Sequence, residues 1–160
     1  MNGITTDQVI AVAEVGAVLL AGVTIFMTLR GLRAQLWLQT FGEYTRRYSE
    51  IVANLPSESR RPGGTFRLEE LGSEQRDKVL NAVRAYLNLC SEEFFLHGRR
   101  KIDGETWGIW RRGIEETVAL PWFRQTWGEM RPEYAAYYPE FCSFMDDCVS
   151  AMPERSKAPS

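Results

Sequence analysis

Residues 9–29 read VIAVAEVGAVLLAGVTIFMTL, and Glu14 is the only charged residue among them. A helix of this length rises about 30 Å, which matches the hydrocarbon core of a bilayer. The helix of a soluble protein would carry polar residues along one face, and this stretch does not. The sequence therefore predicts one transmembrane helix over residues 9–29.

The charges beside this stretch predict its orientation. Asp7 precedes it without any basic residue, whereas Arg30 and Arg33 follow it. Cytoplasmic flanks of membrane helices are enriched in Lys and Arg, so we expect residues 1–8 outside and the remaining chain in the cytoplasm, at the inner (cytoplasmic) membrane. A cleaved signal peptide is the alternative, but residues 1–8 lack the basic residues that open one.

An apolar seam at heptad spacing extends the predicted helix beyond residue 29. Its members are Ala34, Trp37, Phe41, Tyr44, Tyr48, Ile51 and Leu55. No proline interrupts residues 29–55, so the membrane helix is expected to continue for about 26 residues into the cytoplasm. The seam packs either within the domain or in a coiled coil. Coiled coils prefer Leu, Ile and Val to aromatic residues, which favours packing within the domain.

Composition limits the class of protein. The chain has 160 residues, which leaves about 130 after the membrane helix for one soluble domain. A net charge of -2 disfavours nucleic acid as a partner, because proteins that bind nucleic acid normally carry an excess of basic residues. The cysteines, Cys90, Cys142 and Cys148, form no CxxC motif, and we expect them to be free thiols in the core.

Breakers and caps divide the rest of the chain into helices. Residues 56–72 include PSESRRPGG and predict a linker. The next helix is expected to run from Ser73, as its N-cap, to Gly98, as its capping glycine. Further helix starts and breaks are predicted at Asp103, Pro121, Pro132 and Pro139.

The predicted fold class is all-α. An N-terminal transmembrane helix continues into a long cytoplasmic helix, which packs with three to four further helices in a small bundle over residues 30–152. Residues 153–160 read PERSKAPS and are expected to form a disordered tail.

Catalytic and metal motifs find little support in the sequence. The single histidine, His97, lies on an apolar helix face. Glu93, four residues before it, could share that face, but the pair makes only half of a metal site because the chain has no second histidine. Adjacent acids on a helix point about 100° apart and are expected to be solvated. These pairs are Glu69–Glu70, Glu92–Glu93, Glu115–Glu116 and Asp146–Asp147. We therefore name no catalytic residue, metal or cofactor.

Two groups of residues are candidate contacts at the membrane. Small residues lie on one face of the predicted membrane helix: Ala13, Ala17, Ala21 and Thr24. They predict pairing of this helix with another membrane helix. The alternative is that small residues are simply common in membrane helices. The second group is basic: Arg30, Arg33, Arg99, Arg100 and Lys101. If the second long helix returns towards the membrane, these residues are expected to contact anionic lipid or phosphate. The alternative is that the basic residues after that helix lie in a solvated loop.

A third candidate site is a tryptophan-lined pocket. It would be formed by His97, Trp107 and Trp110. The alternative is that these rings fill the core, as they do more often in a small helical bundle.

The segment YLNLCSEEFFLHGRRKIDGETWGIWRRGI (residues 86–114), followed by LPWFRQTW, resembles a loose group of uncharacterised small bacterial single-pass membrane proteins with a cytoplasmic helical domain. The matching residues are Glu92, Glu93, Phe94, Phe95, Asp103, Trp107, Trp110, Pro121 and Trp127. The resemblance covers residues 9–130. It implies an all-helical, membrane-anchored domain and no particular activity.

These observations predict a membrane-anchored protein for interaction, sensing or scaffolding. Its expected partners are the lipid bilayer and either a second copy or another membrane protein. The alternative is a ligand-binding or enzymatic helical bundle with a tryptophan-lined pocket near His97.

Overall fold

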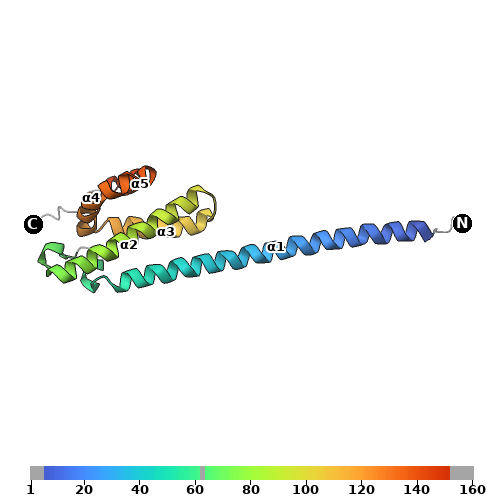
Figure 1. Cartoon of the computed structure of the whole chain (residues 1–160), viewed down its shortest axis with the longest axis horizontal. Helices are drawn as coiled ribbons and strands as arrows, with labels where there is room; N and C mark the ends of the chain where they lie inside the picture. The colour runs from blue at the N-terminus through green and yellow to red at the C-terminus, as the bar shows by residue number, and fades with distance from the viewer. Residues whose placement is uncertain (1–5, 62–63, 152–160) are drawn as a thin grey trace, which may run out of the picture. The chain divides into compact units, whose positions relative to one another are not determined.

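A computed structural model describes residues 6–61 and 64–151, while the side chains of residues 6–13 and 15 lie outside that description. Every regular element in this part of the chain is helical, which confirms the predicted all-α class (Figure 1). The elements are α1 (Thr6–Ala53), the 3₁₀ turns η1 (Ser57–Arg60) and η2 (Leu68–Glu70), α2 (Ser73–Gly98), α3 (Gly104–Val118), α4 (Pro121–Ala135) and α5 (Pro139–Ser150). The expected tail at residues 153–160 lies outside the described residues.

The chain divides into two compact units, Met1–Glu43 and Tyr44–Ser160. The first unit holds most of α1, an uninterrupted helix of 48 residues, so the apolar stretch and the seam as far as Ile51 form one helix. The helix ends at Ala53, two residues before the last predicted seam residue, Leu55. Among the described residues, α1 is the helix that is long and apolar enough to span a membrane. None of its most apolar window is buried. Its exposed apolar side chains include Val18, Leu19, Leu20, Val23, Ile25, Phe26, Met27 and Leu29.

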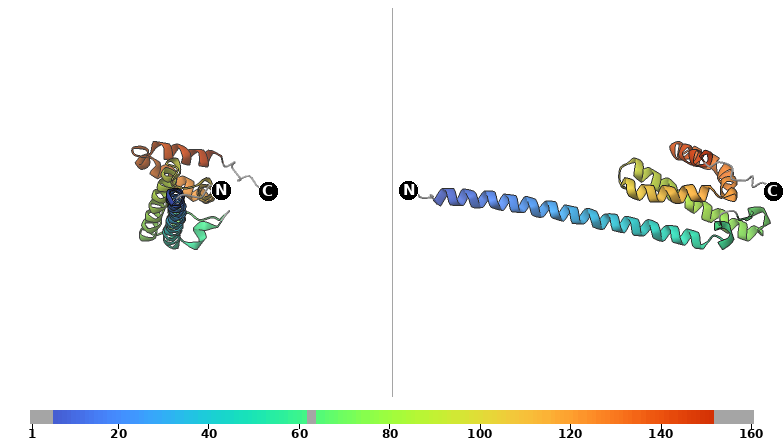
Figure 2. Two further views of the ribbon diagram at one scale, coloured as in Figure 1. Left: turned by 90° about the vertical axis from the view of Figure 1, so that its right-hand side faces the viewer. Right: turned by 180° about the vertical axis from the view of Figure 1, so that it is seen from behind.

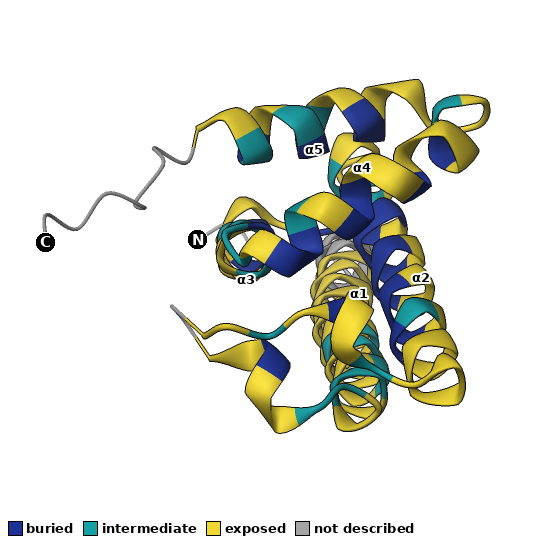
Figure 3. Ribbon diagram, turned by 90° about the vertical axis from the view of Figure 1, so that its left-hand side faces the viewer, coloured by how far each residue is buried: buried dark blue, intermediate teal, exposed yellow. Residues whose placement is uncertain are grey.

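The core of the second unit lies between α2, α3, α4 and α5. The buried apolar residues of α2 lie on one face of the helix, at steps of three or four with Tyr86 and Leu87 side by side: Val79, Val83, Tyr86, Leu87 and Cys90. α3 runs back along α2 and also contacts α4 and α5 (Figures 1 and 2). Figure 3 shows buried residues, in dark blue, on all four of these helices. The fully buried side chains include Phe123 and Met145. All three cysteines are buried free thiols.

The last part of α1 belongs to this second unit and packs on its core. The ring centroids of Tyr48 and Tyr86 are 6.3 Å apart, and Ile51 and Leu55 pack against the buried cluster. The seam from Tyr44 onwards therefore packs within the domain, as expected. In the first unit, Trp37 and Phe41 stack on each other with ring centroids 5.4 Å apart.

The stretch at 56–72, predicted as a linker, makes specific contacts with α4. The indole Nε1 of Trp122 donates a hydrogen bond to the buried carbonyl oxygen of Ser59 at 2.7 Å. The ring of Phe66 meets the edge of Trp122, with centroids 5.3 Å apart. The segment thus covers one side of α4 as part of the domain.

Two of the predicted helix boundaries are wrong in detail. Ser73 is the first residue of α2 and Gly72 is its N-cap, because the Arg76 N–H donates to the Gly72 carbonyl oxygen at 2.9 Å. Pro132 lies inside α4 and does not end it. The buried side chains of Met130 and Tyr134 hold this part of α4 on the core despite the missing proline N–H.

The other expected helix starts are confirmed. The Asp103 carboxylate accepts hydrogen bonds from the backbone N–H and the hydroxyl of Thr106, both at 2.8 Å, and so caps α3. Pro121 and Pro139 are the first residues of α4 and α5, where the missing N–H of proline has no helical partner to lose.

The C-terminal cap of α2 uses an arginine where a glycine was expected. Gly98 is the last helical residue, and Arg100 takes the left-handed conformation with φ of 54°. The Lys101 N–H donates to the Leu96 carbonyl oxygen and the Arg100 N–H donates to the His97 carbonyl oxygen, both at 2.9 Å. This is the hydrogen-bond pattern of a Schellman cap, in which glycine is the common residue.

Arg100→Gly should stabilise the bundle. A non-glycine residue in the left-handed region costs roughly 1–2 kcal/mol, and glycine removes most of that strain. We expect the melting temperature of the detergent-solubilised chain, followed by circular dichroism, to rise by a few degrees. Gly98→Ala is the matched control and should be tolerated, because nothing lies within 4 Å of the added Cβ. Loss of stability in both variants would contradict this cap.

Candidate functional site

The candidate site lies within the second unit, where the end of α1 meets α2 and α3. We call it the α1 contact cluster and define it as Tyr44, Arg47, Glu92, Glu93 and Trp110. Each side chain comes from a helix that packs on the core, so the fold fixes their relative positions.

Arg47 joins α1 to α2 through a bidentate ion pair. Its Nη1 and Nη2 atoms donate to the two carboxylate oxygens of Glu92 at 2.6 and 3.0 Å. The Tyr44 hydroxyl donates to the same carboxylate at 3.2 Å. The hydrogen bond from Arg47 lowers the pKa of Glu92, which therefore carries its charge at neutral pH.

The ring of Tyr44 joins α1 to α3. It stacks on Trp110 with centroids 5.0 Å apart, and the Arg47 guanidinium lies 5.4 Å from the Tyr44 centroid. Burial, together with the charge of Glu92, raises the pKa of Tyr44 to about 12. Its hydroxyl accordingly stays protonated at neutral pH and keeps its role as a donor.

Glu93 is a buried carboxyl on α2 that interacts electrostatically with Arg47 and Glu92. Its side chain is 7% exposed and forms no hydrogen bond with any residue that the structure describes. Burial raises its pKa to about 8; the charge of Arg47 lowers it and the charge of Glu92 raises it further. A carboxyl with this pKa is mostly neutral at pH 7.

The expectation that Glu92 and Glu93 form a solvated acidic pair is therefore wrong for Glu93. Adjacent residues of a helix point about 100° apart, so Glu92 reaches Arg47 while Glu93 turns into the protein. A signal was present in the sequence, since Glu93 falls at helical spacing between Cys90 and His97 on the apolar face of α2.

His97 and Trp107, two of the predicted pocket residues, lie together and cover each other. Their rings stack with centroids 4.7 Å apart and an interplanar angle of 8°. Trp107 also packs on Phe94 and Phe144. Trp110, the third predicted pocket residue, stacks on Tyr44. These contacts favour the interpretation in which the rings fill the core.

His97 keeps one unsatisfied polar atom. Its Nδ1 is buried and has no hydrogen-bond partner among the described residues. Within that same part of the chain, no group of three or more His, Cys, Asp or Glu side chains is arranged to hold a metal ion. One orphan nitrogen beside an aromatic stack provides neither a metal site nor a paired acid and base.

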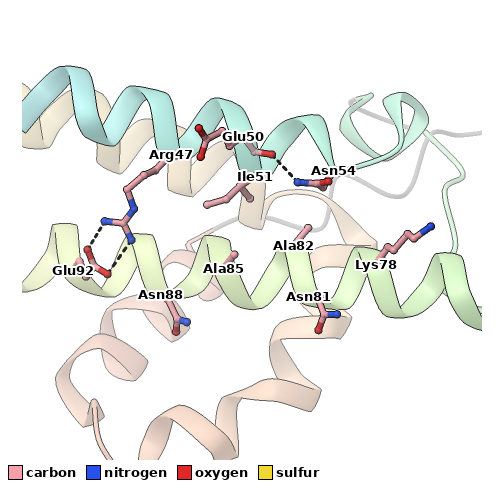
Figure 4. Close-up of a pocket in the computed structure, with 10 residues that line it drawn as sticks. All are labelled: Arg47, Glu50, Ile51, Asn54, Lys78, Asn81, Ala82, Ala85, Asn88 and Glu92. Carbon is pink, nitrogen blue, oxygen red and sulfur yellow. Dashed lines mark hydrogen bonds and ion pairs between the residues drawn. The ribbon is translucent and has the colours of Figure 1, made fainter.

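A groove of about 580 Å³ runs between the end of α1 and α2, and sequence reasoning did not find it (Figure 4). Its lining residues are Arg47, Glu50, Ile51, Asn54, Lys78, Asn81, Ala82, Ala85, Asn88 and Glu92. Arg47 reaches across to Glu92, while Ile51 points towards α2, where Ala82 and Ala85 leave space (Figure 4). The groove is open at this point because Ala82 and Ala85 have small side chains. Two alanines three residues apart on α2 are the sequence signal that could have predicted it.

The candidate membrane contacts are exposed but belong to different units. Ala17, Ala21, Thr24, Arg30 and Arg33 are exposed on the first unit, and the Thr24 hydroxyl donates to the Leu20 carbonyl oxygen at 2.9 Å. The side chain of Ala13 lies outside the described residues. On the second unit, the exposed basic residues follow α2: Arg99, Arg100 and Lys101.

No protein-family profile, curated protein or solved structure matches this chain. The resemblance over residues 9–130 stays a prediction.

Glu93 should make the bundle less stable as the pH rises. Its pKa is about 4.5 in the unfolded chain and about 8 in the folded one, so the folded state binds more protons between these values. The free energy of unfolding therefore falls across that interval and levels off above pH 8. Thermal melts of wild type and Glu93→Gln from pH 5 to pH 8.5 test this: the advantage of the variant over wild type should grow with pH.

Glu92→Gln is the matched control for that experiment. It keeps the buried carboxyl of Glu93, so we expect stability still to fall as the pH rises, with only a small change at neutral pH because the pair with Arg47 is partly exposed. An equal pH dependence in wild type and Glu93→Gln would show that Glu93 is not the group responsible.

Proposed function

We propose that this chain is a single-pass membrane protein whose helical bundle serves in interaction or sensing. The observation that carries the proposal is α1 itself, one continuous helix over Thr6–Ala53. Its early part exposes apolar side chains to the surroundings, and its last part takes part in the α1 contact cluster of the second unit.

The apolar part of α1 supports a membrane location. Residues 16–29 are exposed on every side of the helix, and apolar surface of this extent is unfavourable in water unless lipid or protein covers it. A bilayer provides that cover on every face of a helix. Arg30 and Arg33 favour an orientation with the N-terminus outside and the bundle in the cytoplasm, at the inner membrane of a bacterium.

The α1 contact cluster supports interaction or sensing over catalysis. Arg47 and Tyr44 both donate hydrogen bonds to the Glu92 carboxylate, and these bonds hold the end of α1 against α2. An α-helix transmits rotation along its axis because each turn is hydrogen-bonded to the next. A partner that turned the membrane part of α1 would therefore act on the contacts of Tyr44 and Arg47.

A second copy of the chain is the partner that we consider first. Ala17, Ala21 and Thr24 place small side chains on one face of α1, and the Thr24 hydroxyl already bonds within the helix. Small residues on one face allow two membrane helices to approach closely.

Cysteine labelling should establish the proposed topology. Single Asn2→Cys and Ser156→Cys variants in spheroplasts are treated with a membrane-impermeant maleimide, against the low background expected of three buried native thiols. We expect labelling at position 2 in intact cells and at position 156 only after permeabilisation, with the chain resisting carbonate extraction. Release by carbonate would refute the anchor, and reversed labelling would refute the orientation.

Crosslinking in native membranes tests self-association. The double variant Ala17→Leu/Ala21→Leu adds bulk to the small-residue face and should reduce the crosslinked dimer strongly. Val23→Leu, on a different face of α1, is the matched control and should crosslink like wild type. A monomeric pattern in all three proteins would remove a second copy as the partner while leaving the membrane anchor in place.

A further inference from the structure

The turn between α2 and α3 presents three consecutive basic side chains to solvent. Arg99, Arg100 and Lys101 are all exposed, and none forms an ion pair with a residue that the structure describes. Elsewhere in the second unit, Arg47 and Arg131 form bidentate pairs with carboxylates. The turn is thus a place where positive charge is left without a carboxylate partner.

The shape of this turn is fixed at both ends. The Schellman cap closes α2, and the Asp103 carboxylate caps α3 through Thr106. Between the caps, Ile102 is buried in the core cluster. The three basic side chains therefore extend from an ordered backbone, which lowers the loss of conformational entropy on binding.

An aromatic side chain lies beside these charges. Phe95, one turn before the end of α2, is 58% exposed, and the Arg99 guanidinium lies 5.1 Å from its ring centroid. An exposed aromatic ring next to basic groups suits the boundary between lipid headgroups and acyl chains. Free phosphate or nucleic-acid backbone would use the charges alone.

Arg100 adds a second indication that the charges matter. It occupies a left-handed position where glycine would be less strained, so its side chain is present at the expense of stability. Two acids stand at the start of α3: the Asp103 carboxylate caps the helix through Thr106, whereas Glu105 is exposed and has no ion-pair partner among the described residues.

We propose that the α2–α3 turn docks on the anionic headgroups of the bilayer in which α1 is anchored, through Arg99, Arg100, Lys101 and Phe95. The inference rests on the proposed membrane anchor, which would keep the bundle at a high local concentration near the lipid surface. Each basic residue near an anionic surface contributes about fivefold to the ratio of docked to undocked bundle.

The test uses the full-length chain in nanodiscs. Gly98→Cys carries a fluorophore on the turn, and Tyr137→Cys carries it at an exposed position between α4 and α5. A lipid with a spin label on its headgroup quenches a fluorophore that lies at the surface. We expect stronger quenching at position 98 with about 30% phosphatidylglycerol than with phosphatidylcholine alone, reversed by about 0.5 M NaCl. Position 137 should respond much less.

Three variants separate docking from folding. Arg99→Gln/Arg100→Gln/Lys101→Gln should lower quenching at position 98 to the level of neutral lipid. Arg100→Gly should weaken quenching although it stabilises the fold, and Glu105→Gln should strengthen it. Equal quenching in both lipid compositions, unchanged by the triple variant, would overturn the docking while leaving the anchor intact. Failure of the chain to enter nanodiscs would refute the anchor and the docking together.

Discussion

The ion pair between Arg47 and Glu92 sets how the end of α1 lies on the bundle. Both side chains are partly exposed, so the pair adds little free energy of its own. Packing of the partly buried seam residues Ile51 and Leu55 supplies more, but apolar side chains tolerate a shift along the helix. A shift by one turn would part Arg47 from Glu92. The apolar seam therefore attaches the end of α1 to the bundle, and the ion pair fixes the position of α1 along α2.

Glu93 follows from the same contact. Two adjacent carboxyls face a single arginine, and Arg47 engages Glu92 with both of its terminal nitrogens. Glu93 has no donor of its own among the described residues, and in a buried place it keeps its proton up to a pH of about 8. Ionisation of Glu93 would put a second negative charge near Glu92 in a buried place, which is why we expect the bundle to lose stability as the pH rises.

Local rules predicted much of the fold, because they act between residues close in sequence. Ser73 and Gly98 placed the bounds of α2 to within a residue, Asp103 capped α3, and Pro121 and Pro139 opened α4 and α5. Contacts between distant residues were beyond those rules: the Ser59 carbonyl meets the Trp122 indole 63 positions later, which turns an expected linker into part of the domain. Of the α1 contact cluster, Trp110 was identified as a candidate residue, but Tyr44 and Arg47 as partners of Glu92 were not.

The join between the end of α1 and the bundle limits how a signal could pass along the chain. Rotation of α1 would act on the stack of Tyr44 on Trp110 and on the ion pair of Arg47 with Glu92. Helix hydrogen bonds resist untwisting, whereas a partly exposed ion pair separates readily. Within the second unit, we therefore expect rotation to separate this ion pair more readily than the packed side chains of Ile51 and Leu55. A sensing protein built on this fold would respond first at that contact, next to the carboxyl whose charge depends on pH.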